Sequence, residues 1–145
     1  MFQHVLIPTD GSAHANRAIE QGTALAKTLG ARVTILTVVE PFHVLSMDPK
    51  HAAEGRSTYE RLAKAEATRI LAEADKVAQK HGVAYATAQE EHEHPHQAIL
   101  EAAAKGSCDL IAMGSHGRRG VVALILGSVT AKVLAHSPLP VLIYR

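Results

Sequence analysis

The chain has 145 residues, a hydrophobic fraction of 47% and a formal net charge of +1, which fit one globular domain with a sizeable core. This composition excludes intrinsic disorder and gives no sign of a large basic surface for nucleic acid. Cys108 is the single cysteine, the first residues lack a signal-peptide pattern, and no apolar run reaches the roughly 18 residues of a membrane span. We therefore expect a cytoplasmic, soluble domain with neither nucleic acid nor membrane as a partner.

Strand and helix patterns alternate from the start of the chain. Phe2 to Pro8 is a short apolar run that predicts a buried strand, and the turn PTDGS follows it. Ser12 is a suitable N-cap for a helix that Gly30 ends. The β-branched run Arg32–Val39 predicts a second strand, and the mixed segment 41–55, with two prolines, predicts a loop.

The alternation continues through the rest of the chain. The predicted elements are a helix over Ser57–His81, a weak strand over Val83–Glu91, a helix over Pro95–Lys105, a strand over Asp109–Met113, a helix over Gly127–His136 and a strand over Pro140–Tyr144. This order predicts one α/β domain, a three-layer α/β/α sandwich with a parallel sheet between two helix layers. Ligands of such sheets bind at the carboxyl ends of the strands, near a switch in strand order.

A glycine-rich segment, MGSHGRRGVVALILGSVT, follows the strand DLIAM at the edge where a ligand is expected. Gly114, Gly117 and Gly120 leave the backbone bare, so that their N–H groups could form an anion-binding nest. Gly127 and Ser128 open a helix, whose free N–H groups and dipole favour a phosphate. The segment therefore predicts a polyphosphate site, with a nucleotide as the simplest ligand.

Side chains in the same segment support this prediction. The hydroxyls of Ser128 and Thr130 could bind phosphate oxygens, and Arg118 and Arg119 could neutralise their charge. The alternative is that the glycines serve only as turns and the arginine pair is solvated surface. The sequence contains neither a Walker A loop nor the dinucleotide pattern G-x-G-x-x-G, which argues against a fast NTPase and an NAD enzyme.

The spacing Gly114-x2-Gly117-x9-Gly127-Ser128 resembles the nucleotide motif G-x2-G-x9-G-[ST] of the universal stress protein family, in its ATP-binding branch. The stretches LIPTDGS, ILTVVEP and SPLPVLIY are similar to the family's first, second and closing strands, so the resemblance covers nearly the whole chain. It implies a five-stranded parallel sheet of the Rossmann-like, adenine nucleotide alpha hydrolase type. It also implies homodimers, and ATP, with Mg or Mn, bound in a cleft.

The resemblance also implies which residues contact the nucleotide. Asp10 and the backbone of Val38 would face the adenine, Pro8 and Thr9 would wall the pocket, and Gly114 would approach the ribose. The phosphates would lie against Gly117, Arg118, Gly127, Ser128, Val129 and Thr130. The remaining members of the implied site are Met113, Ser115, His116, Arg119 and Gly120. Asp10 alone could equally be a turn residue, and a loop-shaping role is favoured for His116.

The stretch EHEHPHQAIL departs from the family, because many members have a glycine before the third helix where this chain has Glu93 and His94. His92, His94 and His96 alternate, so on an extended strand they would share one face, with a spacing that could hold Zn or Ni. A solvated, polar strand end is the alternative, and it is favoured because no carboxylate or cysteine framework accompanies the histidines.

Two functional classes follow. In the first, the protein is a nucleotide-dependent sensor or regulator in a stress response; in the second, it is a slow ATPase that uses the same cleft. The first is favoured because the sequence offers no evident general base or Walker-type acid, and a metal-handling protein is a distant third. The final strand, Val141 to Tyr144, is expected to form a homodimer if it lies at a sheet edge, whereas a central position would place any dimer contact elsewhere.

Overall fold

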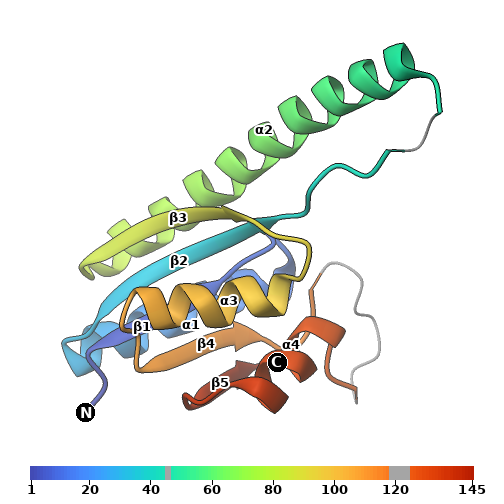
Figure 1. Cartoon of the computed structure of the whole chain (residues 1–145). Coiled ribbons are helices and arrows are strands. Elements are labelled where there is room, and N and C mark those ends of the chain that lie inside the picture. The colour runs from blue at the N-terminus through green and yellow to red at the C-terminus, as the bar shows by residue number, and fades with distance from the viewer. Residues whose placement is uncertain (45–46, 118–124) are drawn as a thin grey trace.

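A computed structural model of the protein describes residues 1–44, 47–117 and 125–145, and within these residues strands and helices alternate as predicted (Figure 1). The strands are β1 (His4–Pro8), β2 (Arg32–Val39), β3 (Tyr85–Glu91), β4 (Leu110–Gly114) and β5 (Val141–Tyr144). The helices are α1 (Ala13–Leu29), α2 (Pro49–His81), α3 (Pro95–Lys105) and α4 (Ser128–His136). The strands form one parallel sheet in the order β3-β2-β1-β4-β5.

The central strand β1 separates two hydrophobic layers. Its residues are all buried, with Val5 and Ile7 in the layer under α1 and α2, and Leu6 in the layer under α3 and α4. This alternation follows from the two-residue period of a strand. The three-layer α/β/α sandwich predicted from the sequence is confirmed, and β1 can be a nearly continuous apolar run because both of its faces are covered.

The second helix begins earlier than the sequence pattern indicated. Residues 49–55 were expected in a loop, but α2 starts at Pro49, with the Asp48 side chain accepting a hydrogen bond from the Lys50 N–H at 2.9 Å. Proline is tolerated at the first helical position, because its missing N–H would have no partner there. Leu62 is 55% exposed, since the first half of α2 extends beyond the sheet (Figure 1).

The strand order determines where a ligand can bind. The chain adds β2 and β3 on one side of β1 and then crosses to place β4 and β5 on the other side. The switch point therefore lies between β1 and β4, and the glycine-rich segment begins at the carboxyl end of β4. Strand β5 pairs with β4 at the end of the sheet, so the alternative of a central β5 is wrong. None of the helices in the described part of the chain is long and apolar enough to cross a bilayer.

Candidate functional site

A cavity of about 800 Å³ lies at the carboxyl ends of the strands, where the switch point predicts it. Its walls come from the turn after β1, the end of β2, the α2 and α3 helices, and the segment between β4 and α4. Most of the predicted site residues line it: Pro8, Thr9, Asp10, Val38, Met113, Gly114, His116, Gly117, Gly127, Ser128, Val129 and Thr130. Ser115 is buried behind the wall, and Arg118, Arg119 and Gly120 lie outside the described residues.

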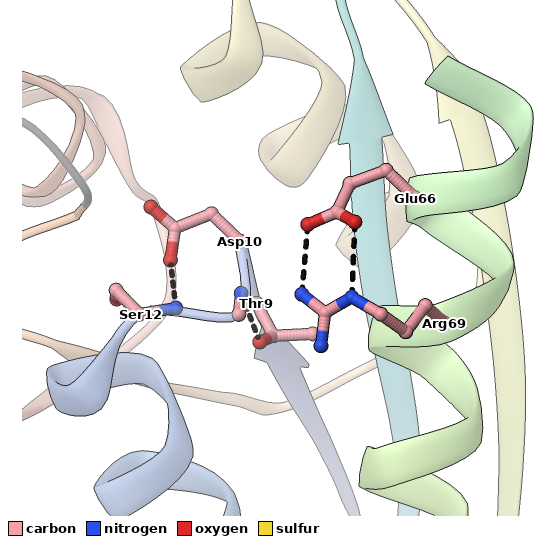
Figure 2. A network of polar contacts seen from close by, with 6 residues as sticks. Thr9, Asp10, Ser12, Glu66 and Arg69 are labelled. Atoms are coloured by element: carbon pink, nitrogen blue, oxygen red, sulfur yellow. Dashed lines mark hydrogen bonds and ion pairs between the residues drawn. The ribbon is translucent and has the colours of Figure 1, made fainter. Parts of the chain in front are cut away.

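The turn after β1 is shaped by its own side chains (Figure 2). The Thr9 hydroxyl accepts a hydrogen bond from the Gly11 N–H at 3.1 Å, and Asp10 Oδ1 accepts one from the Ser12 N–H at 2.9 Å. Asp10 therefore has the turn role that the sequence left open. Its other oxygen, Oδ2, lies 2.5 Å from where a Cβ on residue 117 would stand, so Gly117 makes room for the carboxylate.

Two other glycines of the motif are needed for contacts between backbone segments. A Cβ on Gly114 would stand 2.7 Å from the carbonyl carbon of His14, which is too close for any real contact. A Cβ on Gly127 would stand 3.1 Å from the Cα of His116, and the Gly127 N–H donates to the Ser115 carbonyl at 2.8 Å. The glycine spacing thus brings α1, β4 and the start of α4 together around the cavity.

The helices that begin on the cavity lack side-chain caps. In the described residues no side chain caps α3 or α4, whereas Ser12 caps α1 with a 3.2 Å bond to the Ala15 N–H. The first N–H groups of a helix have no intrahelical partner, and they carry the positive end of its dipole. The start of α4 is therefore a ready binding site for an anion in the cavity. The Thr130 hydroxyl is not available to that anion as a donor, because it donates to the Gly114 carbonyl at 2.9 Å.

His116 presents a second unsatisfied donor or acceptor on this wall. The residue is 7% exposed, and its Nδ1 lies 3.0 Å from the Ser115 hydroxyl. Its Nε2 is buried and has no hydrogen-bond partner in the part of the chain that the structure describes. An unsatisfied buried polar atom costs about 1–3 kcal/mol, so a ligand or water that reaches this nitrogen gains that amount back.

The family model of the universal stress proteins matches residues 1–145 of this chain. A universal stress protein of Thermus aquaticus, from the QAH/OAS sulfhydrylase 3′ region, is 37% identical over 145 residues, with both chains covered in full. The chain belongs to the universal stress protein family.

Solved structures extend this family assignment to the fold. The hypothetical protein MJ0577, a test case for assigning biochemical function from structure, superposes with a TM-score of 0.82 and 27% identity, covering 99% of this chain and 96% of its own. A universal stress protein in complex with cAMP superposes with a TM-score of 0.73 and 26% identity, covering 99% and 97%. The Rossmann-like fold implied by the motif is therefore confirmed, and a related protein binds an adenine nucleotide.

Sequence reasoning missed one wall of this universal stress protein's cavity. Ala63, Glu66, Ala67 and Ile70 of α2 line it, and their i, i+3, i+4, i+7 spacing is the signal that they share one helix face. The Glu66 carboxylate accepts two hydrogen bonds from the Arg69 guanidinium, at 2.7 and 2.9 Å, beside the Thr9 turn (Figure 2). Lys132, one turn into α4, also lines the cavity, and its spacing from Ser128 could have revealed it.

The histidine-rich stretch does not have the geometry of the metal site considered for it. His92 follows β3, His94 is the N-cap of α3 and His96 lies inside α3, so the three do not share the face of a strand. No group of three or more potential metal ligands converges within residues 1–44, 47–117 and 125–145. Cys108 is buried, as expected for a small hydrophobic residue, and burial raises the pKa of its thiol.

Proposed function

We propose that this universal stress protein binds ATP in the cavity and acts as a nucleotide-dependent regulator in a stress response. The observation that carries the proposal is the uncapped start of α4, which opens on the cavity that His116 also lines. The buried Nε2 of His116 has no hydrogen-bond partner among the described residues. Backbone N–H groups and a helix dipole recognise a phosphate without any special side chain. The complex of a relative with cAMP supports an adenine nucleotide as the ligand class.

The cavity offers distinct surroundings for the two ends of such a ligand. Val38, Ile70 and Pro8 provide an apolar wall for the base, near the Asp10 carboxylate. Ser128 and Gly127 are at the phosphate end. A Mg or Mn ion would be held largely by the phosphates, as is usual for nucleotide sites. We propose binding without rapid turnover, because the sequence has no Walker A lysine. Two of the cavity carboxylates, Asp10 and Glu66, are also engaged in hydrogen bonds with the Ser12 N–H and Arg69.

A substitution at Ser128 tests the proposal while it preserves the helix. Gly127→Val is unsuitable, since its side chain would meet the backbone of Ser115 and His116. In Ser128→Asp, a carboxylate at the start of α4 supports the helix dipole by about 0.3–1 kcal/mol but repels a phosphate. Calorimetry should show ATP affinity falling at least about tenfold, or about 1.4 kcal/mol, with a smaller loss for adenosine.

The matched control is Ser128→Asn, because asparagine has nearly the same size as aspartate but carries no charge. We expect it to bind ATP within about threefold of the wild type, a difference of less than 1 kcal/mol. Mass spectrometry of the small molecules released from the purified wild-type protein identifies the nucleotide directly. Equal ATP affinity in the Asp and Asn variants, with both folded, would show that no phosphate lies at the start of α4.

A further inference from the structure

Four histidine rings form a row from the end of β3 to the end of α4. Neighbouring ring centroids are 6.1 Å apart for His92 and His94, 6.2 Å for His94 and His96, and 5.9 Å for His96 and His136. The last contact joins α3 to α4, so the row, which we call the histidine row, bridges the two uncapped helices. This arrangement was not visible in the sequence, because His136 is forty residues beyond His96.

The outer and inner members of the histidine row differ in their contacts. His92 lies 3.7 Å from the Glu101 carboxylate, and His136 Nδ1 lies 2.8 Å from the Lys132 carbonyl. The inner pair, His94 and His96, both line the cavity. Within the described residues, neither inner imidazole has a side-chain hydrogen bond. The inner pair can therefore offer ring N–H groups to a ligand in the cavity.

Charged side chains of both signs line the cavity that holds the inner pair. Lys132 lines the cavity on α4, and Glu93, the neighbour of His94 in the chain, lines it as well. The other cavity carboxylates, Asp10, Glu40 and Glu66, come from the turn after β1, the end of β2 and α2. Partial burial lowers the pKa of His96, and the positive charges of Lys132 and the other row histidines lower it further. In the ligand-free protein these effects favour the uncharged form of the His96 imidazole.

We propose that His94, His96 and Lys132 form a subsite for the terminal phosphate of a nucleoside di- or triphosphate, engaged when His96 takes up a proton. The inference rests on the proposed nucleotide function and extends it, since it names a second anion position in the same cavity. A doubly charged phosphate group offsets the repulsion between neighbouring cations, and charged imidazoles donate strong hydrogen bonds to its oxygens. The start of α4 holds one phosphate, and this wall holds the next along the chain of phosphates.

The subsite makes nucleotide selectivity dependent on pH. Because the phosphate favours the charged imidazole, binding of ATP takes up protons and strengthens as the pH falls through the range in which histidine titrates. AMP has no terminal phosphate to reach the subsite, so its affinity lacks this contribution. The ratio of ATP to AMP affinity is therefore the diagnostic quantity, since effects on the shared part of the ligand cancel.

Calorimetric titration at about pH 6 and about pH 7.5 tests the subsite on three proteins. These are the wild type, the double variant His94→Gln/His96→Gln, and a control with His43→Gln/His51→Gln, whose histidines lie away from the cavity. We expect the ATP-to-AMP ratio to rise at least about fivefold at the lower pH in the wild type and the control. In the His94→Gln/His96→Gln variant the ATP-to-AMP ratio should change less than about twofold between the two pH values, because only the other titrating groups still contribute.

Two further measurements make the outcome independent of folding problems in one variant. NMR titration of the wild type should show the pKa of His96 rising on addition of ATP but not of AMP. Lys132→Gln should lower the ATP-to-AMP ratio at both pH values. If the His94/His96 variant binds with the wild-type ratio at both pH values, the subsite is wrong although the nucleotide function stands. If no protein binds a nucleotide at either pH, the proposed function fails and the subsite fails with it.

Discussion

At the scale of single residues, the glycines of the motif allow close contacts within the protein, in addition to the role in ligand binding proposed for them. Gly114 sits where the backbone of His14 passes, and Gly117 faces the Asp10 carboxylate. An interpretation of the motif as a phosphate-binding loop alone does not account for these contacts. The glycines are required because α1, β4 and the start of α4 converge on the switch point, where backbone segments approach too closely for a Cβ.

Substitutions at two glycines should therefore have opposite effects on stability. Gly114→Ala places a Cβ 2.7 Å from the carbonyl carbon of His14, so we expect a loss of about 1–3 kcal/mol in the free energy of unfolding. Gly55→Ala, inside α2, meets only Phe42 at an ordinary 3.5 Å and should gain up to about 1 kcal/mol from helix propensity. Urea denaturation of both variants measures the difference, and equal effects would refute this account of Gly114.

At the scale of elements, α2 has two halves with different supports. Its buried residues, Ala67, Ile70, Ala74 and Ala78, all lie in the second half, where the helix packs on the sheet and α1. The first half projects beyond the sheet (Figure 1). There the Tyr59 ring contacts Phe42 with centroids 5.6 Å apart, and its hydroxyl donates to the Glu40 carbonyl.

Hydrogen exchange should separate the two halves of α2. Few apolar contacts hold the first half, so we expect amides of residues 50–60 to exchange at least about tenfold faster than those of residues 67–78. Tyr59→Ala should accelerate exchange further in residues 50–60 and leave residues 67–78 unchanged. Mass spectrometry of peptides after exchange measures this, and a uniform exchange rate along α2 would contradict it.

At the scale of the whole molecule, β5 leaves one edge of the sheet open in the chain as described. The Pro140 carbonyl accepts from the Ile111 N–H at 3.1 Å, and the Tyr144 carbonyl accepts from the Ser115 N–H at 2.8 Å. The polar groups of alternate strand residues point to opposite sides. Residues 140, 142 and 144 therefore face β4, and Val141 and Ile143 present their N–H and C=O groups outward. We propose that this edge pairs with its copy in a homodimer.

Proline at position 143 tests this dimer. Ile143→Pro removes an outward N–H, so light scattering should show a shift from dimer towards monomer. Ile143→Ala is the matched control, because it shortens the side chain at least as much as Ile143→Pro does but keeps the backbone N–H. We expect this variant to remain dimeric. A monomeric wild type, or a folded Ile143→Pro protein that dimerises as tightly as Ile143→Ala, would exclude β5 as the interface.

Features that depend on local chemistry could be predicted from the amino-acid sequence. The strand runs, the Ser12 cap and the helix end at Gly30 were all predicted, because each depends on neighbours within a few residues. The parallel three-layer fold followed from the alternation of these elements. The spacing of Gly114, Gly117 and Gly127 indicated the family, since the motif is specific even without coordinates.

Contacts between residues far apart in the chain could not be predicted and became visible in the three-dimensional packing. The start of α2 was missed because proline suits both a loop and a first helical turn, and the packing of the chain determines which one forms. Strand order placed β5 at an edge, brought Glu66 to the cavity and set His136 beside His96. Local patterns cannot specify such contacts, because their free energy comes from burying surfaces that lie far apart in the chain.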